Sequence, residues 1–215
     1  SGHSLAYRPP ESIAAGRYGV PGDIYQVGLV MYQLLGGRLP YDPLAWLNRN
    51  EKKKHRAITD GVDQQIFAND CIKRQIQRGA VVDMDSLPPW VCVQLRRTIS
   101  KATATEPERR YQSCGEFLAR LGAIRSEIRD WRVQGGFPTR QNGTEYRIVP
   151  VPNAPRFQVQ KRAGHNWRRD NSFQHASVDI LVNQIEERIR HQVGRGYGSQ
   201  SRRPPQAKLG KRRNT

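Results

Sequence analysis

The sequence predicts a mainly α-helical fold, followed by a small α+β unit and a basic tail without regular structure. Apolar residues recur at three- and four-residue intervals over much of residues 1–130, which is typical of helices. Alternation of apolar and polar residues, the period of half-buried strands, begins only after Trp131. From Gly194 onward Gly, Ser, Pro and Arg dominate. We therefore expect three parts, residues 1–130, 131–193 and 194–215.

The first part is predicted to contain one buried central helix. Residues 1–22 are rich in Pro and Gly and predict an ordered loop with at most one short helix. From Asp23 to Leu35 the chain is apolar nearly all round, which is typical of a helix covered on every side. Asp23 is placed to cap the helix, and Gly36 and Gly37 are expected to end it.

Three further helices follow in the same part, and no helix is predicted in the lysine-rich residues 44–60. The first of them spans Asp63 to Arg78, the second opens at Pro88-Pro89, and the third starts near Ser113. The buried stripe of the third is expected to be Phe117, Leu121, Ile124 and Ile128. Ser113 and Glu116 have the spacing of a capping box. We expect no strand before residue 131.

The second part is predicted to contain two strands and one helix. The strands are Glu145–Val151 and Arg156–Arg162, and the helix runs from His175 to Gln192 with an apolar stripe along one side. Residues 194–215 are expected to be disordered.

Charge is concentrated at the C-terminal end of the chain. The net charge is +17, and residues 131–215 hold 17 Lys or Arg against 5 Asp or Glu. An acidic or nucleic-acid partner is therefore expected to bind there. The best cluster is Lys161-Arg162 with Trp167-Arg168-Arg169, since arginines beside aromatic rings can hold phosphates and stack on bases. The alternative is that these charges form an ordinary solvated face.

The cysteine pattern predicts a reduced, cytoplasmic protein without a metal site. The three cysteines, Cys71, Cys92 and Cys114, are far apart in the sequence and none belongs to a CxxC pair. We expect them to fill helical cores. The longest apolar stretch, Val27–Leu35, is far shorter than the ~20 residues that cross a bilayer, so no membrane segment is expected.

Four segments between residues 3 and 122 have a recognisable order and spacing. They are Tyr7-Arg8-Pro9-Pro10-Glu11, Gly22-Asp23-Ile24-Tyr25-Gln26-Val27-Gly28, Leu34-Leu35-Gly36-Gly37-Arg38-Leu39-Pro40-Tyr41, and Lys101-Ala102 with Glu106-Pro107-Glu108-Arg109-Arg110-Tyr111. Together they resemble the C-terminal lobe of eukaryotic-like (Hanks-type) serine/threonine protein kinases. In that family they end the activation segment, open and close the central helix, and form the D-P-x-x-R signature. Pro9 replaces the family's Ala, and Tyr25 replaces its Trp.

The resemblance implies structural roles for four residues. Glu11 and Arg110 would form the family's buried ion pair, whereas two unrelated surface charges are the alternative. Asp23 would hold the backbone of the catalytic loop, with a simple helix cap as the alternative or as an added role. Gly28 belongs to the same central-helix motif.

The resemblance also implies a substrate-docking loop at Ser4, Leu5, Ala6 and Tyr7. His3 stands where the family has Gly, and a frayed terminus is the alternative. The intact protein would transfer phosphate from ATP, with Mg²⁺, to Ser or Thr of protein substrates.

The motifs that catalyse phosphoryl transfer are missing from this sequence. No G-x-G-x-x-G, G-x-x-x-x-G-K-[ST] or His-Arg-Asp segment occurs. The chain lacks an initiator methionine and starts within a motif, so we expect a truncated fragment. No catalytic residue is expected, nor productive binding of ATP and Mg²⁺. Three functions stay open: a piece of an active kinase, an inactive kinase-like scaffold, and a basic nucleic-acid-binding module formed by residues 131–215.

Overall fold

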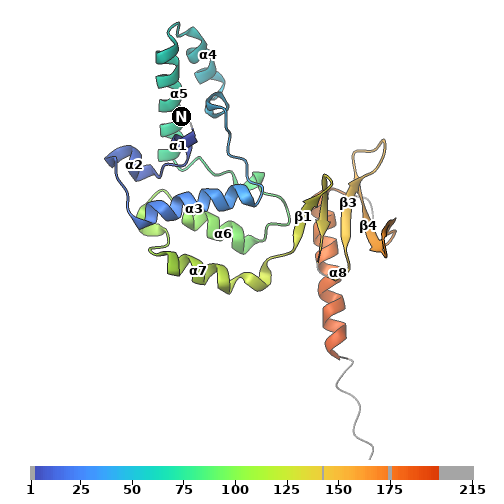
Figure 1. The fold of residues 1–215 in the computed structure, drawn as a ribbon. Coiled ribbons are helices and arrows are strands. Elements are labelled where there is room, and N and C mark those ends of the chain that lie inside the picture. Colours follow the sequence, from blue (N-terminus) through green and yellow to red (C-terminus); the bar gives the residue numbers. More distant parts are fainter. Residues whose placement is uncertain (1–2, 142, 174–175, 199–215) are drawn as a thin grey trace, which may run out of the picture. The chain divides into compact units, whose positions relative to one another are not determined.

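The computed structural model describes residues 3–141, 143–173 and 176–198, which form two compact units divided after Asp130. The first unit is helical, and the second is a sheet with one long helix (Figure 1). The tail expected to be disordered comprises residues 194–215. Its residues 199–215 lie outside the described part of the chain.

The first unit contains seven α-helices within its described residues, joined by loops and short 3₁₀ turns. The helices are α1 (His3–Ala6), α2 (Pro10–Ala15), α3 (Val20–Leu34), α4 (Arg49–Ala57), α5 (Gly61–Gln77), α6 (Val93–Ala102) and α7 (Cys114–Ala123). The 3₁₀ turns are η1 (Pro43–Trp46), η2 (Met84–Ser86), η3 (Pro107–Arg109) and η4 (Arg125–Glu127). Helix α3 packs against α6 and α7, while α5 packs against α1, α2 and α4 (Figure 1).

Helix α3 is the centre of the first unit, but only part of its surface is buried. Tyr25, Leu29 and Tyr32 are covered almost completely. Val27 and Leu34, on the other side, are 49% and 83% exposed, so the prediction of burial all round is wrong. Because the helix begins at Val20 with Gly19 as its cap, Asp23 lies within the first turn instead of capping it.

Several predicted helix boundaries are also wrong. Helix α6 begins at Val93, so the two prolines precede it without opening it. They lie in a turn that the Arg96 guanidinium closes by donating to the carbonyl oxygens of Leu87 and Pro88 at 3.1 and 2.9 Å. Helix α7 ends at Ala123, and Ile128, assigned to its buried stripe, is 45% exposed.

The described part of the first unit contains two more helices than the sequence predicted, even when the one short helix allowed before residue 22 is included. Helices α1 and α2 lie in the segment predicted as a loop with at most one short helix. Helix α4 lies in the lysine-rich stretch, where a capping box starts it. The side chain of Asn48 accepts from the backbone N–H of Glu51, and the Glu51 carboxylate accepts from the backbone N–H of Asn48.

The second unit is a five-stranded antiparallel meander with one helix on one face (Figure 1). Its elements are β1 (Trp131–Gln134), β2 (Phe137–Arg140), β3 (Tyr146–Pro150), β4 (Phe157–Ala163), β5 (Asn166–Arg169) and α8 (Val178–Gly198). Only β3 and β4 were predicted as strands. The predicted disorder of residues 194–198 is also wrong, because α8 continues through them.

The core of the second unit lies between the sheet and α8. Alternate residues of β3 and β4, including Tyr146, Ile148 and Val159, are buried, as are Leu181 and Ile185 of α8. Side chains alternate between the two faces of a strand, and directly paired residues share a face. The register therefore assigns every strand residue either to the α8 face or to the opposite face.

The cysteines differ in their surroundings. Cys71 is buried in the core between α3 and α5, as expected, whereas Cys92 is half-buried and Cys114 is exposed, which contradicts a core role for Cys114. Among the described residues, no helix has the length and apolar character of a bilayer span. Nor do the described residues contain a group of three or more His, Cys, Asp or Glu side chains that could hold a metal ion.

Candidate functional sites

The first site is an ion pair between residues 99 positions apart in the sequence. The Arg110 Nη1 and Nη2 groups donate to Oε1 and Oε2 of Glu11, both at 2.8 Å. The Arg110 side chain is fully buried, and that of Glu11 is 21% exposed. This is the contact that the family resemblance implied.

Arg110 binds backbone as well as the carboxylate. Its guanidinium donates to the carbonyl oxygens of Ala104 at 2.7 Å, Thr105 at 3.0 Å and Pro21 at 3.0 Å. These contacts engage all five N–H groups of the side chain. The pair therefore fastens α2, the start of α3 and the loop after α6 to one another.

The Arg110 guanidinium also lies against the ring of Tyr25 on α3, with 4.9 Å between its central carbon and the ring centre. Burial raises the pKa of Tyr25 to about 12, more than the nearby Arg110 lowers it. The hydroxyl is thus held neutral deep in the unit.

Gly28 and Asp23 have different surroundings on α3. A Cβ atom at Gly28 would lie 2.9 Å from the side chains of Ala102 and Thr103, so glycine allows α3 and α6 to approach closely. Asp23 is exposed. Its implied role in holding a catalytic loop stays a prediction.

The second site is a hollow of about 150 Å³ beside the predicted docking loop. The residues that line it are Ala6, Tyr7, Gln33, Leu39, Pro40, Tyr41, Pro43, Trp46 and Ile72. The Tyr7 hydroxyl donates to Oε1 of Gln33 on α3 at 2.6 Å, which fixes the Tyr7 ring at the edge of the hollow. Ser4 lies in α1, and Leu5 packs against the core. Of the four predicted docking residues, Ala6 and Tyr7 line the hollow.

A second buried arginine–glutamate pair, in the second unit, was not predicted from the sequence. Glu186 on α8 accepts from Nε of Arg140 at 3.2 Å and from Nε1 of Trp131 at 2.8 Å. The two charged side chains are 10% and 7% exposed. A signal was present in the sequence, because Glu186 follows Val182 by four residues and so interrupts the apolar stripe of α8.

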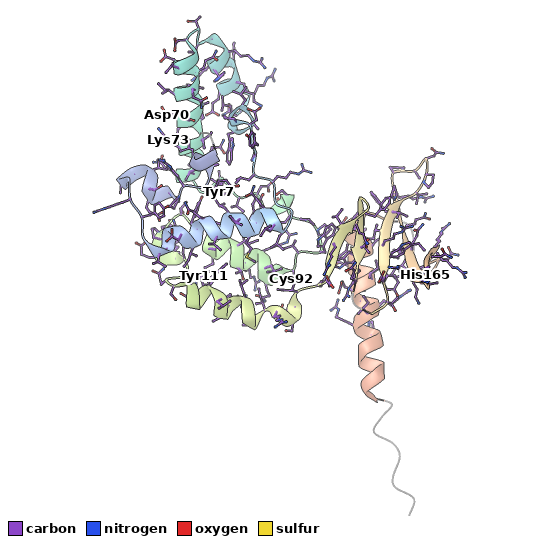
Figure 2. All side chains as sticks on the ribbon, viewed as in Figure 1. Tyr7, Asp70, Lys73, Cys92, Tyr111 and His165 are labelled. Carbon is purple, nitrogen blue, oxygen red and sulfur yellow. The ribbon has the colours of Figure 1, made fainter. Side chains whose placement is uncertain are left out.

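The five predicted nucleic-acid contacts lie on the β4–β5 hairpin, whose turn carries His165 (Figure 2). Arg162 pairs with Trp167, whereas Lys161 pairs with Arg168. Since Lys161 also pairs with the buried Tyr146, Lys161 and Arg168 belong to the α8 face. Arg162, Trp167 and Arg169 belong to the opposite face. The structure therefore divides the predicted cluster between the two sides of the sheet.

The face opposite α8 gains residues that sequence reasoning missed. The register adds Arg147, Gln160 and Phe137 to it. The Arg147 guanidinium carbon lies 4.6 Å from the ring centre of Trp167 and 5.8 Å from that of Phe137. We call the set of Phe137, Arg147, Gln160, Arg162, Trp167 and Arg169 the arginine–aromatic face.

Comparison with known proteins gives a partial relative and no family. No protein-family model matches the chain. A stretch of 81 residues, 38% of this chain, is 35% identical to the probable inactive leucine-rich repeat receptor kinase XIAO of Oryza sativa subsp. japonica. The match covers 5% of that protein, so the chain spans only about one-twentieth of the length of the curated relative it matches. The match is weak and partial, and it makes the chain kinase-related at most.

Proposed function

We propose that residues 3–130 act as a kinase-like scaffold that binds a segment of another protein without transferring phosphate. The observation that carries the proposal is the hollow beside Tyr7, together with the Glu11–Arg110 pair that fixes the surrounding helices. The resemblance to a kinase C-terminal lobe and the partial match to a probable inactive receptor kinase both support the kinase-like part.

The non-catalytic part of the proposal rests on chemistry. Phosphoryl transfer needs residues that position ATP, bind Mg²⁺ and accept the proton of the attacking hydroxyl. The sequence contains none of the motifs that supply them. We therefore expect neither ATP nor Mg²⁺ to bind productively to this chain.

The protein-binding part of the proposal rests on the lining of the hollow. Leu39, Pro40 and Pro43 give it apolar walls, and the paired Tyr7 and Gln33 give it one polar edge. A hollow of this size accepts a single apolar side chain. An extended peptide that inserts one Leu, Met or Phe would fit its shape and polarity.

The experiment is selection of displayed random peptides on the purified chain, followed by titration of the peptides that share a motif. Binding of the shared motif should weaken at least ~10-fold in Leu39→Glu, because burying a new carboxylate against the apolar walls is costly. Leu118→Glu is the matched control, since Leu118 is 70% exposed on α7.

A phosphorylation assay with ATP and Mg²⁺ completes the test. We expect no labelled product and no ATP-dependent shift in melting temperature. Phosphate transfer by the purified chain would refute the non-catalytic part. Peptides that bind Leu39→Glu and the native chain equally would refute the docking part.

A further inference from the structure

We infer that the arginine–aromatic face of the second unit binds single-stranded nucleic acid. This inference concerns a different unit from the proposed scaffold and does not depend on it. It starts from Arg147, whose guanidinium carbon lies 4.6 Å from the ring centre of Trp167 and 5.8 Å from that of Phe137.

The geometry of Arg147 is fixed, which favours recognition of a planar ligand. Its Nε donates to Oε1 of Gln160, directly opposite on β4, at 2.6 Å. That bond uses one of the five N–H groups of the side chain. A guanidinium beside aromatic rings offers donors for a phosphate, and an exposed guanidinium or aromatic plane offers a stacking surface for a base.

Charge on this face continues across the neighbouring strands. The guanidinium carbon of Arg162 lies 5.9 Å from the ring centre of Trp167. Nη1 of Arg162 forms an ion pair with Oε2 of Glu145 at 2.8 Å. Arg169 pairs with Gln160 in the sheet and is exposed. Arg132, opposite Thr139 on β1, is also exposed on this side. A flexible chain of phosphates would meet a positive charge along most of the width of the sheet.

The combination of features favours a single strand over an acidic protein or a duplex. An acidic peptide would use the arginines but would gain little from the two rings. A duplex keeps its bases stacked inside, so it cannot place them on Trp167 or on the guanidinium of Arg147. Unpaired bases can use both kinds of surface, and base–aromatic stacking does not depend on sequence.

The experiment measures binding of a labelled oligothymidine of about 12 nucleotides, a length within the ~4–16 nucleotides that compact single-strand sites cover. Fluorescence anisotropy is recorded with the full chain over a range of salt concentrations. The first variant is Arg147→Ala with Arg162→Ala. Its matched control is Lys161→Ala with Arg168→Ala, which removes the same charge from β4 and β5 on the α8 face.

We expect a larger effect from the Arg147/Arg162 variant than from its control. Binding is expected to weaken linearly when its logarithm is plotted against the logarithm of the salt concentration, and we call the steepness of that line the salt slope. We expect the Arg147/Arg162 variant to lower the salt slope by about 1.4, at ~0.7 for each lost phosphate contact on a single strand. We expect the control to change the slope by less than half of that. If the two variants lower the salt slope equally, the binding is unspecific attraction by net charge and the inference is overturned. The basic residues after residue 198 are identical in both variants and cannot produce a difference between them.

Trp167→Leu tests stacking without any change of charge. We expect it to weaken binding by about 5- to 150-fold with an unchanged salt slope, the range for loss of one stacked base. Far-UV circular dichroism verifies that each variant remains folded. Unchanged affinity in folded Trp167→Leu, or tighter binding of a duplex of the same length, would contradict single-strand recognition.

Discussion

Each of the two units contains one buried arginine–glutamate pair, and the two pairs bind their surroundings differently. Arg110 donates to both oxygens of Glu11 and to three backbone carbonyl oxygens. Glu186 instead collects donors, from Arg140 on β2 and from Trp131 on β1. The first pair is organised around the cation and joins two helices and a loop, while the second is organised around the anion and joins a helix to a sheet.

The difference indicates what each pair contributes. A buried charge is costly unless its hydrogen-bonding capacity is met, and Arg110 meets its own capacity with both oxygens of Glu11 and three backbone carbonyl oxygens. The position of the loops around it therefore depends on the arginine. In the second unit the strands already have their ladder bonds, so the contacts of Glu186 with β1 and β2 fix the position of α8 on the sheet.

The largest effect is expected from Arg110→Met in the first unit. Removal of the cation leaves Glu11 mostly buried and three carbonyl oxygens without their donor, a loss of about 3–5 kcal/mol in the free energy of unfolding. Hydrogen exchange followed by mass spectrometry should show faster exchange throughout residues 3–130 and little change in the second unit.

The neighbouring arginine provides the control for this substitution. Arg109 is 76% exposed in its pair with Glu106, so Arg109→Met should cost less than ~1 kcal/mol. Similar losses from both substitutions would contradict the special position of Arg110.

A smaller effect is expected from Glu186→Gln in the second unit. The amide keeps one oxygen as an acceptor for Trp131 but removes the charge that faces Arg140. We expect a loss of about 1.5–3 kcal/mol, the range for hydrogen bonds to charged groups. Exchange should increase along α8 more than along β3 and β4. Glu187→Gln, at an exposed position, is the control, and equal exchange in the two variants would argue against a fastening role for Glu186.

The two ion pairs also differ in how well they could be predicted from the sequence. The Glu11–Arg110 contact was reached through a resemblance between motifs, because 99 intervening positions carry no local periodicity that could predict it. The Arg140–Glu186 pair has no motif. A charge within the apolar stripe of α8 was the visible signal, and its partner could be found only once β2 was known.

The strands and helices that were missed have physical reasons. Strands β1, β2 and β5 have four residues each, too few for a period-2 pattern to be distinguished from chance. Helix α4 has a strongly polar sequence, and the evidence for it was the capping box at Asn48, not periodicity. Burial of α3 was overestimated because its apolar residues surround the helix, whereas only one side of it packs against described elements.

Tyr25 allows the environment of the first pair to be probed by pH. Its pKa is about 12 in the folded chain because burial disfavours the phenolate, against about 10 when unfolded. The stabilisation is complete below pH 10 and is lost as pH rises toward 12, because the unfolded chain releases the proton first. Between pH 8 and pH 11 the free energy of unfolding of the wild type should therefore fall by about 1.4 kcal/mol more than that of Tyr25→Phe. Urea unfolding at pH 8 and pH 11 measures this difference, and Tyr18→Phe, at a 44% exposed position, should not reproduce it.

The smallest effect is expected from Asn48→Ala, which tests whether α4 depends on its cap. The Asn48 side chain accepts from the backbone N–H groups of Asn50 and Glu51, both at 2.9 Å. Loss of these bonds should cost about 1 kcal/mol and should speed exchange in α4 without changing α3. The backbone N–H of Asn48 also lowers the pKa of Glu51. The contribution of Glu51 to the free energy of unfolding is therefore present at pH values above its ordinary pKa. It is lost as the pH falls through the lowered pKa of the folded chain. Asn50→Ala leaves both capping bonds in place, since they use the backbone of residue 50, and should have little effect. If Asn50→Ala and Asn48→Ala speed exchange in α4 equally, then α4 does not depend on the capping box.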